Sequence, residues 1–163
     1  MYMPGLEELY ETYSSDIYRF AYWLSGNSPD AEDITSETFI RAWFNYDSTK
    51  TETLKAYLMK IARNIYLEII RKNKNHTRLD EQFPDRHYSL EKSTEQAEEL
   101  ETVRNFLQTI NEDDRSAFIM RVEHDLPYTE IARVLRISET AAKVKVHRVR
   151  KKYWKHTRKD LYD

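Results

Sequence analysis

Cysteine is absent from the 163 residues of this chain. Disulfides and zinc sites built on thiolates are therefore excluded, and the absence suits the reducing cytoplasm. Glycine occurs only twice and proline only four times. So few glycines leave no room for a glycine-rich phosphate loop, and helices have few residues to break them. The composition predicts a compact protein of the all-α class.

Long apolar runs are missing as well. No stretch approaches the roughly 18 apolar residues that span a bilayer, and the first residues lack the pattern of a signal peptide. We therefore expect a soluble, cytoplasmic protein. The five histidines are scattered, without the i, i+4 pair of a metal-binding helix. We expect no metal, no cofactor, no small-molecule substrate and no catalytic residue.

Residues 126–152 predict two short helices joined by a tight turn. The first has apolar side chains at helical spacing, and Ser138 can cap the second. The second carries a stripe suited to a core, formed by Ala142, Val146, Val149 and Tyr153. Its other side is cationic.

The positive charge is concentrated at the end of the chain. From Arg133 onward there are eleven Lys and Arg against three Asp and Glu, although the whole chain carries a net charge of only −2. A DNA major groove admits one α-helix, and phosphates and base edges bind Lys, Arg and His. The pattern is typical of a helix-turn-helix, with a solvated basic surface helix as the alternative.

The N-terminal half predicts three helices, over residues 6–25, 29–46 and 53–75. The expected buried side of the second helix consists of Ala31, Ile34, Phe39, Ala42, Trp43 and Tyr46. A different face of this helix mixes charged residues with Ile40 and Phe44, which indicates either a protein partner or simple solvent exposure. The third helix ends in a basic segment that favours its own C-terminus and would also favour a phosphate backbone.

Helical spacing is lost in the middle of the chain. We expect domains at residues 1–76 and 96–163, joined by a flexible linker at 77–95. In the second domain, spacing resumes near Leu100, and Asn111 can cap a further helix. The expected buried face of that helix consists of Phe118, Ile119 and Val122.

Three segments together resemble the extracytoplasmic-function (group IV) RNA polymerase sigma factors. PDAEDITSETFIRAW resembles region 2.2 of that family, and AYLMKIARNIYLEIIRK resembles regions 2.3 and 2.4. INEDDRSAFIMRVEHDLPYTEIARVLRISETAAKVKVHRVRKK resembles region 4. The segments follow the family's order and cover most of the chain. The resemblance implies a region 2 domain and a region 4 domain that direct promoter-specific transcription initiation.

The resemblance also implies partners and roles. The partners would be core RNA polymerase, through its clamp coiled coil and flap region, promoter DNA, and an anti-sigma factor, which in this family is often membrane-bound. The residues implied in polymerase binding are Asp33, Ser36, Glu37, Ile40 and Arg41. Those implied at the minus-ten element are Lys60, Arg63, Asn64 and Arg71. Those implied at the minus-thirty-five element are Lys143, Val144, His147, Arg148, Arg150 and Lys151.

Two other functions fit parts of the pattern. One is an autonomous helix-turn-helix regulator whose N-terminal domain senses a ligand or dimerises. The other is a helical adaptor or antagonist that binds polymerase without DNA. The mixed-charge second helix and the basic third helix favour the sigma factor, because a dimerisation domain needs no basic track for DNA.

Overall fold

The computed structural model describes residues 5–45, 53–76 and 94–162, and within them it contains seven α-helices and no β-strand. A first group consists of α1 (Leu6–Ser25), α2 (Ser28–Asn45) and α3 (Leu54–His76). A second group consists of α4 (Glu95–Gln108), α5 (Glu112–Val122), α6 (Tyr128–Leu135) and α7 (Glu139–Tyr162). The all-α prediction is confirmed, whereas most of the predicted linker, residues 77–93, lies outside the described residues.

Side-chain caps explain where two helices of the second group begin. The Asn111 side chain accepts a hydrogen bond from the backbone N–H of Asp114 at 3.0 Å, ahead of α5. Ser138 Oγ accepts one from the N–H of Ala141 at 3.1 Å, ahead of α7. Each cap satisfies a backbone donor that the first helical turn leaves without a partner. Both predicted caps are confirmed.

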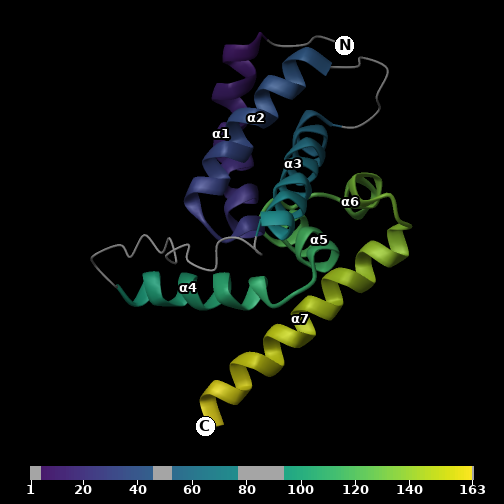
Figure 1. Cartoon of the computed structure of the whole chain (residues 1–163). Coiled ribbons are helices and arrows are strands. Elements are labelled where there is room, and N and C mark those ends of the chain that lie inside the picture. Colours follow the sequence, from purple (N-terminus) through teal and green to yellow (C-terminus); the bar gives the residue numbers. More distant parts are fainter. Residues whose placement is uncertain (1–4, 46–52, 77–93, 163) are drawn as a thin grey trace.

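The first group is a bundle in which each helix packs against the other two (Figure 1). All three helices contribute fully buried side chains, among them Leu9, Ile17, Phe20, Leu24, Ile34, Leu58 and Met59. Burying a side chain of this size stabilises a fold by about 1.5–3 kcal/mol. The predicted buried side of α2 is confirmed for Ala31, Ile34, Phe39 and Ala42, whereas Tyr46 lies outside the described residues. It is wrong for Trp43, which is 43% exposed because the helix ends two residues later and no further turn shields it.

In the second group, α6 and α7 form the predicted helix-turn-helix, and both pack on α5. The α7 stripe is confirmed, since Ala142, Val146 and Val149 are fully buried and Tyr153 is partly buried. Val122 was expected in the core of α5 but is 50% exposed, because it is the last residue of the helix, where the chain turns away. Past this contact α7 continues as a long helix that projects from the rest of the molecule (Figure 1).

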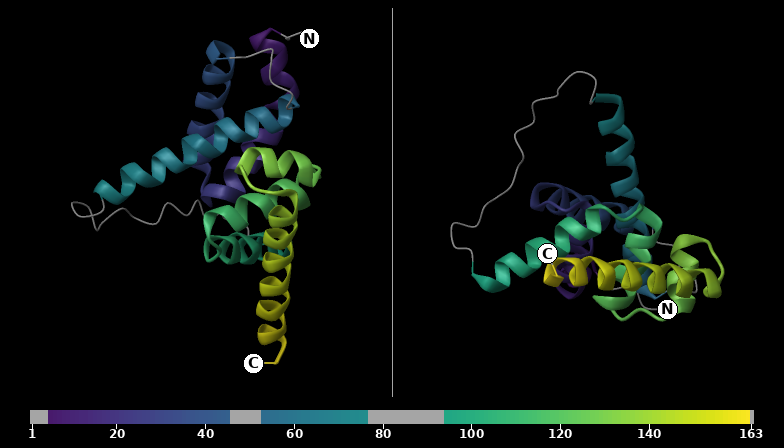
Figure 2. Two further views of the ribbon diagram at one scale, coloured as in Figure 1. Left: turned by 90° about the vertical axis from the view of Figure 1, so that its right-hand side faces the viewer. Right: turned by 90° about the horizontal axis from the view of Figure 1, so that it is seen from below.

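The two groups pack directly against each other, with α4 and α5 beside α1 and with α6 beside α3 (Figure 2). At the C-terminus of α1, the buried Arg104 side chain of α4 donates from Nη1 to the Gly26 carbonyl at 2.8 Å. Gly26 has a φ of 79°, and a Cβ there would lie 2.8 Å from the side chain of Gln108. This corner therefore requires glycine for its left-handed backbone conformation, whereas the flexible end of the Gln108 side chain could move aside for a Cβ.

Candidate functional site

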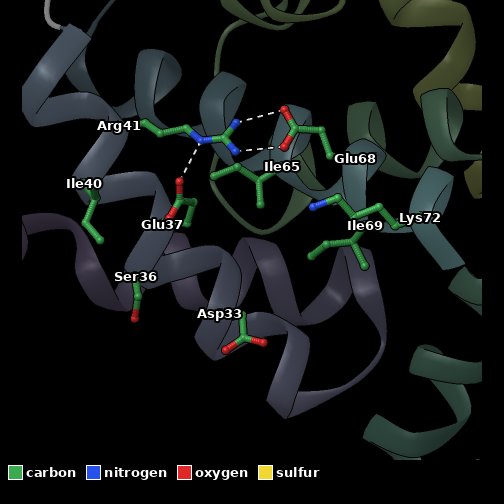
Figure 3. Close-up of a pocket in the computed structure, with 9 residues that line it drawn as sticks. All are labelled: Asp33, Ser36, Glu37, Ile40, Arg41, Ile65, Glu68, Ile69 and Lys72. Atoms are coloured by element: carbon green, nitrogen blue, oxygen red, sulfur yellow. Dashed lines mark hydrogen bonds and ion pairs between the residues drawn. The ribbon is translucent and has the colours of Figure 1, made fainter.

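An open groove between α2 and α3 brings together the five α2 residues that the resemblance assigns to polymerase binding (Figure 3). These are Asp33, Ser36, Glu37, Ile40 and Arg41. The facing wall comes from α3 and consists of Ile65, Glu68, Ile69 and Lys72. Sequence reasoning missed this wall, because no local pattern connects α3 with residues that lie about 30 positions earlier in the chain.

Arg41 links the two walls of the groove. Its Nη1 and Nη2 donate to the two carboxylate oxygens of Glu68 at 3.0 and 2.8 Å, and its Nε donates to Glu37 at 3.0 Å (Figure 3). The hydrogen bonds with Glu68 and then Glu37 raise the pKa of Arg41, and the bond from Arg41 lowers the pKa of Glu68. A guanidinium held by two carboxylates has a fixed orientation, so this face is geometrically defined before any partner binds.

Apolar side chains lie exposed beside this ion-pair network. Ile40 is 50% exposed and Phe44 is 79% exposed, both on α2. Exposed apolar groups next to oriented charges are typical of protein interfaces, in which an apolar centre is surrounded by polar contacts. The groove thus has the composition of a protein-binding surface.

The residues predicted along α3 for DNA do not share one environment. Asn64 and Arg71 are exposed, and Lys60 is partly buried. Arg63 differs from these, because its side chain is only 13% exposed. The predicted DNA track is therefore open at some positions and covered at Arg63.

Two carboxylates of α5 cover Arg63. Glu112 accepts hydrogen bonds from its Nε at 2.6 Å and from its Nη2 at 2.8 Å, and Asp113 accepts another from Nη2 at 2.7 Å. These ion pairs join the first helix group to the second. No pattern in the sequence indicated this contact, because the partners are about 50 residues apart.

The six residues of α7 predicted to contact DNA are all exposed, on the sides of the helix away from its buried stripe. They are Lys143, Val144, His147, Arg148, Arg150 and Lys151. Five of these six side chains carry nitrogen donors suited to phosphates and base edges. The arrangement is that of a helix able to enter a DNA groove with its apolar side anchored on α5 and α6.

A buried carboxylate beneath α7 was missed by the sequence analysis. Asp114 is fully buried, and its side chain accepts hydrogen bonds from Arg148 Nη1 at 3.2 and 3.3 Å. Lys145 Nζ lies 3.4 Å from the same carboxylate. Acidic residues are common in the first turn of a helix, so no sequence pattern distinguishes Asp114 from its neighbours there. The structure adds that it anchors one of the predicted DNA-binding arginines.

Neither a metal cluster nor a membrane helix is found in the part of the chain that the structure describes. No group of three or more His, Cys, Asp or Glu side chains there is arranged to hold a metal ion. None of the described helices combines the length and the apolar character needed to cross a bilayer. Among the described residues, the candidate functional surfaces are the groove between α2 and α3, the α3 track and the cationic side of α7.

Two family profiles match the chain. Residues 9–76 match the family described as Sigma-70 region 2, which spans nearly all of α1, α2 and α3. Residues 100–152 match Sigma-70, region 4, which begins within α4 and ends within α7. The two matches fall on the two helix groups in the order expected from the sequence.

Individual relatives agree with these matches. The ECF RNA polymerase sigma factor EcfG of Rhodopseudomonas palustris is 30% identical over 138 residues, which cover 82% of this chain and 74% of that protein. The ECF RNA polymerase sigma factor SigM of Bacillus subtilis is 26% identical over 149 residues, covering 90% of this chain and 91% of that protein. The sigma factor RpoE of Bartonella quintana, solved in complex with the anti-sigma factor NepR, is 25% identical with a TM-score of 0.73, covering 89% of this chain and 91% of that one.

Proposed function

This chain belongs to the extracytoplasmic-function family of RNA polymerase sigma factors, and we propose that it acts in the cytoplasm, recruiting core RNA polymerase to a defined set of promoters. Sigma factors direct initiation without catalysing a reaction, so the chain is not an enzyme, and the chemistry belongs to the polymerase. In this proposal, residues 1–76 bind the polymerase and the minus-ten element, and residues 96–163 bind the minus-thirty-five element. Residues 77–95 connect them.

The groove between α2 and α3 is the proposed polymerase surface. The observation that supports it is the Arg41 network beside exposed Ile40, because oriented charges around an apolar contact suit a coiled coil with a mixed surface. Asp33, Ser36 and Glu37 complete the α2 side. The clamp coiled coil of the largest polymerase subunit is the proposed partner here, and the flap region is the proposed partner of the second domain.

Promoter DNA is the proposed partner of α3 and α7. Lys60, Arg63, Asn64 and Arg71 would hold the melted minus-ten strand, since cations that follow a backbone suit single-stranded DNA. On α7, base contacts would come from Lys143, Val144, His147 and Arg148, with Arg150 and Lys151 on phosphates. An anti-sigma factor is a further proposed partner, supported by the similarity to RpoE, which was solved with NepR.

Replacing Arg41 with alanine is expected to weaken binding of core RNA polymerase at least tenfold. The change removes the guanidinium and leaves the carboxylates of Glu37 and Glu68 without their shared partner in the groove. A tenfold loss corresponds to about 1.4 kcal/mol, which lies in the range of binding free energy lost when alanine replaces an important interface residue. Binding would be measured by fluorescence anisotropy, and activity by run-off transcription with purified core enzyme on fragmented genomic DNA.

Arg19 provides the control, because it is also a partly exposed arginine held by two carboxylates, with Asp16 at 2.7 Å on its own helix and with Glu123 at 3.4 Å. Arg19→Ala should leave polymerase affinity within about twofold, since a surface pair of this kind contributes little.

Discrete transcripts that depend on the protein would support the proposal. Specific DNA retention by the protein alone, without such transcripts, would instead favour the autonomous regulator, which the family matches disfavour.

Asp114→Asn is expected to lower the preference of the protein for its minus-thirty-five element about fivefold. The amide removes the charge that anchors Arg148 and Lys145, so Arg148 loses its fixed position before DNA binds. Fivefold corresponds to about 1 kcal/mol, the lower end of one lost specific contact. The measurement is the ratio of dissociation constants for promoter and unrelated duplexes at one salt concentration.

The control is Glu139→Gln, which makes the same chemical change in an exposed pair with Lys143 at 4.0 Å. Its ratio should stay within twofold of the unmodified protein. An equal effect of both variants would mean that net charge, and not the position of Arg148, determines the preference.

A further inference from the structure

A second groove lies within the second helix group, between α4 and α7. The two helices meet where Phe106 packs against Tyr153, with ring centroids 5.2 Å apart. From this contact α4 leads away toward its N-terminus and α7 toward its C-terminus, so the two helices diverge (Figure 1). The groove between them has a volume of about 430 Å³ and is lined by Gln96, Glu99, Leu100, Thr102, Val103 and Tyr153. Most of its wall thus belongs to α4.

Apolar side chains lie exposed along this groove. Gln96, Leu100 and Val103 are four and three positions apart, so they share one side of α4. Leu100 is 55% exposed, and Val103 is only partly buried. On α7, Trp154 follows the groove residue Tyr153 and is 61% exposed. Exposed apolar side chains on two adjacent helices favour a protein partner.

The helices on the two sides of the groove carry opposite charge. Residues 95–103 of α4 contain four glutamates and no Lys or Arg, and residues 150–159 of α7 contain six Lys and Arg and no Asp or Glu. Glu95, Glu99, Lys155 and Arg158 are exposed, and none of them forms an ion pair within the described part of the chain. These charges suit the helix dipoles, but the dipoles do not account for the exposed leucine and tryptophan beside them.

We propose that the groove between α4 and α7 is a dimerisation surface, on which α4 of one copy of the chain lies along the C-terminal half of α7 of a second copy. In a two-fold dimer both copies use the same patch, so the patch must be complementary to itself. An acidic helix beside a basic one meets this condition, because the rotation places each α4 against the α7 of the partner copy. Leu100 and Trp154 then lose contact with water in the interface.

The size of the contact predicts a weak dimer. Because α4 has 14 residues, it is about 21 Å long and about 10 Å wide, and two reciprocal contacts bury about 800 Å² in total. Interfaces below about 1,200 Å² are typical of transient complexes. We therefore expect a micromolar dissociation constant that rises as salt screens the charges. The groove around Arg41 lies between α2 and α3 and takes no part in the proposed contact.

Charge reversal on one helix at a time tests the dimer. Glu95→Lys with Glu99→Lys places lysine opposite the basic end of α7, and Lys155→Glu with Arg158→Glu places glutamate opposite α4. Each variant alone is expected to self-associate at least tenfold more weakly than the parent protein, as measured by sedimentation velocity between about 1 and 100 µM.

The two variants should recover the dimer when they are mixed in equal amounts. Each α4 then again faces an α7 of opposite charge, so the heterodimer is expected to be within about threefold of the parent dimer in affinity. A misfolded variant would not give this recovery, and circular dichroism verifies the helical content of each protein.

The matched control is Glu7→Lys with Glu11→Lys, which makes the same change at the same four-residue spacing on exposed positions of α1. It should self-associate like the parent protein. A parent protein that stays monomeric at about 100 µM would overturn the dimer. Equal self-association of the parent and both α4 and α7 variants would overturn it as well, and so would a mixture that remains monomeric.

Discussion

Arg115→Met is expected to lower the free energy of unfolding by about 3 kcal/mol. Arg115 is 7% exposed, and its Nη1 donates to the carbonyl of Leu24 at 2.6 Å and to the hydroxyl of Tyr66 at 2.8 Å. Its Nη2 donates to the carbonyl of Ile110 at 2.9 Å. Each hydrogen bond from a charged donor contributes about 1.5–3 kcal/mol, and methionine recovers part of this by apolar burial.

The acceptors explain why a buried cation is stable here. The Leu24 carbonyl lies in the last turn of α1, where helix carbonyls lack partners and the helix dipole is negative. Arg115 thus caps a helix of the other domain while Tyr66 holds it from α3. Its loss removes this donor from the Ile110 carbonyl and the Tyr66 hydroxyl, and at the Leu24 carbonyl only the longer bond from Gln108 Nε2, at 3.4 Å, remains.

Urea unfolding followed by circular dichroism would measure the change, with Arg121→Met as the control. Arg121 lies on the same helix, is 33% exposed and donates to the carbonyl of Leu126 at 3.1 Å. Its replacement should cost about 1 kcal/mol or less. If the two variants were equally stable, Arg115 would not hold the domains together.

Helices with strong local signals could be predicted closely from the sequence. The two helices predicted within residues 126–152 are present as α6 and α7, and α7 begins directly after its predicted cap at Ser138, although it is longer than expected. The start of α4 was not apparent, because its first residues are polar and the apolar spacing becomes visible only near Leu100. Leu100 itself is 55% exposed. Local signals locate helices, but they do not show which apolar residues lose contact with water.

The functional surfaces likewise combine features that the sequence predicts with features that depend on the tertiary fold. The cationic side of α7 follows from helical periodicity alone, since its buried stripe is set by residues three and four positions apart. Glu68 and Asp114 could not be predicted, because each acts on a residue of another helix, 27 and 34 positions away in the chain. Contacts at such separations depend on the tertiary fold.

The packing of the two domains was the least predictable feature. Arg104 and Arg115 hold it by donating to backbone carbonyls at Gly26 and Leu24, 78 and 91 residues earlier in the chain. Every residue has such a carbonyl, so the acceptor leaves no signal in the sequence. An arginine in a polar segment is normally interpreted as exposed, because arginines are rarely buried. The sequence therefore could not show that the two helix groups pack against each other and share buried contacts.

His124 makes the stability of the folded protein, with its two helix groups packed together, depend on pH. The side chain is 5% exposed and lies against Phe20 of α1, with ring centroids 6.1 Å apart. Neither ring nitrogen has a hydrogen-bond partner among the described residues. Burial, then the charge of Lys55, lowers the pKa of His124 to about 4; Arg19 adds to this and Asp16 opposes it. The folded protein thus disfavours the protonated imidazole.

The direction of the pH effect follows from proton binding. In the unfolded chain His124 is protonated below a pKa of about 6.5, whereas in the folded chain it is protonated only below a pKa of about 4. The stability that the neutral imidazole contributes is therefore fully present above about pH 6.5 and is lost as the pH falls toward 4. At about 1.4 kcal/mol per pKa unit, His124 alone should remove about 2 kcal/mol between pH 7.5 and pH 5, and about 3 kcal/mol by pH 4.

Urea unfolding of the parent and of His124→Phe at pH 7.5 and pH 5 isolates this contribution, because other titrating groups affect both proteins alike. Phenylalanine keeps an aromatic ring against Phe20 but cannot be protonated, so the variant should lose about 2 kcal/mol less than the parent on acidification. His147→Gln is the control, since His147 is exposed on α7 and should leave the pH dependence unchanged. Equal acid losses in the parent and His124→Phe would show that His124 takes up its proton without disturbing the fold.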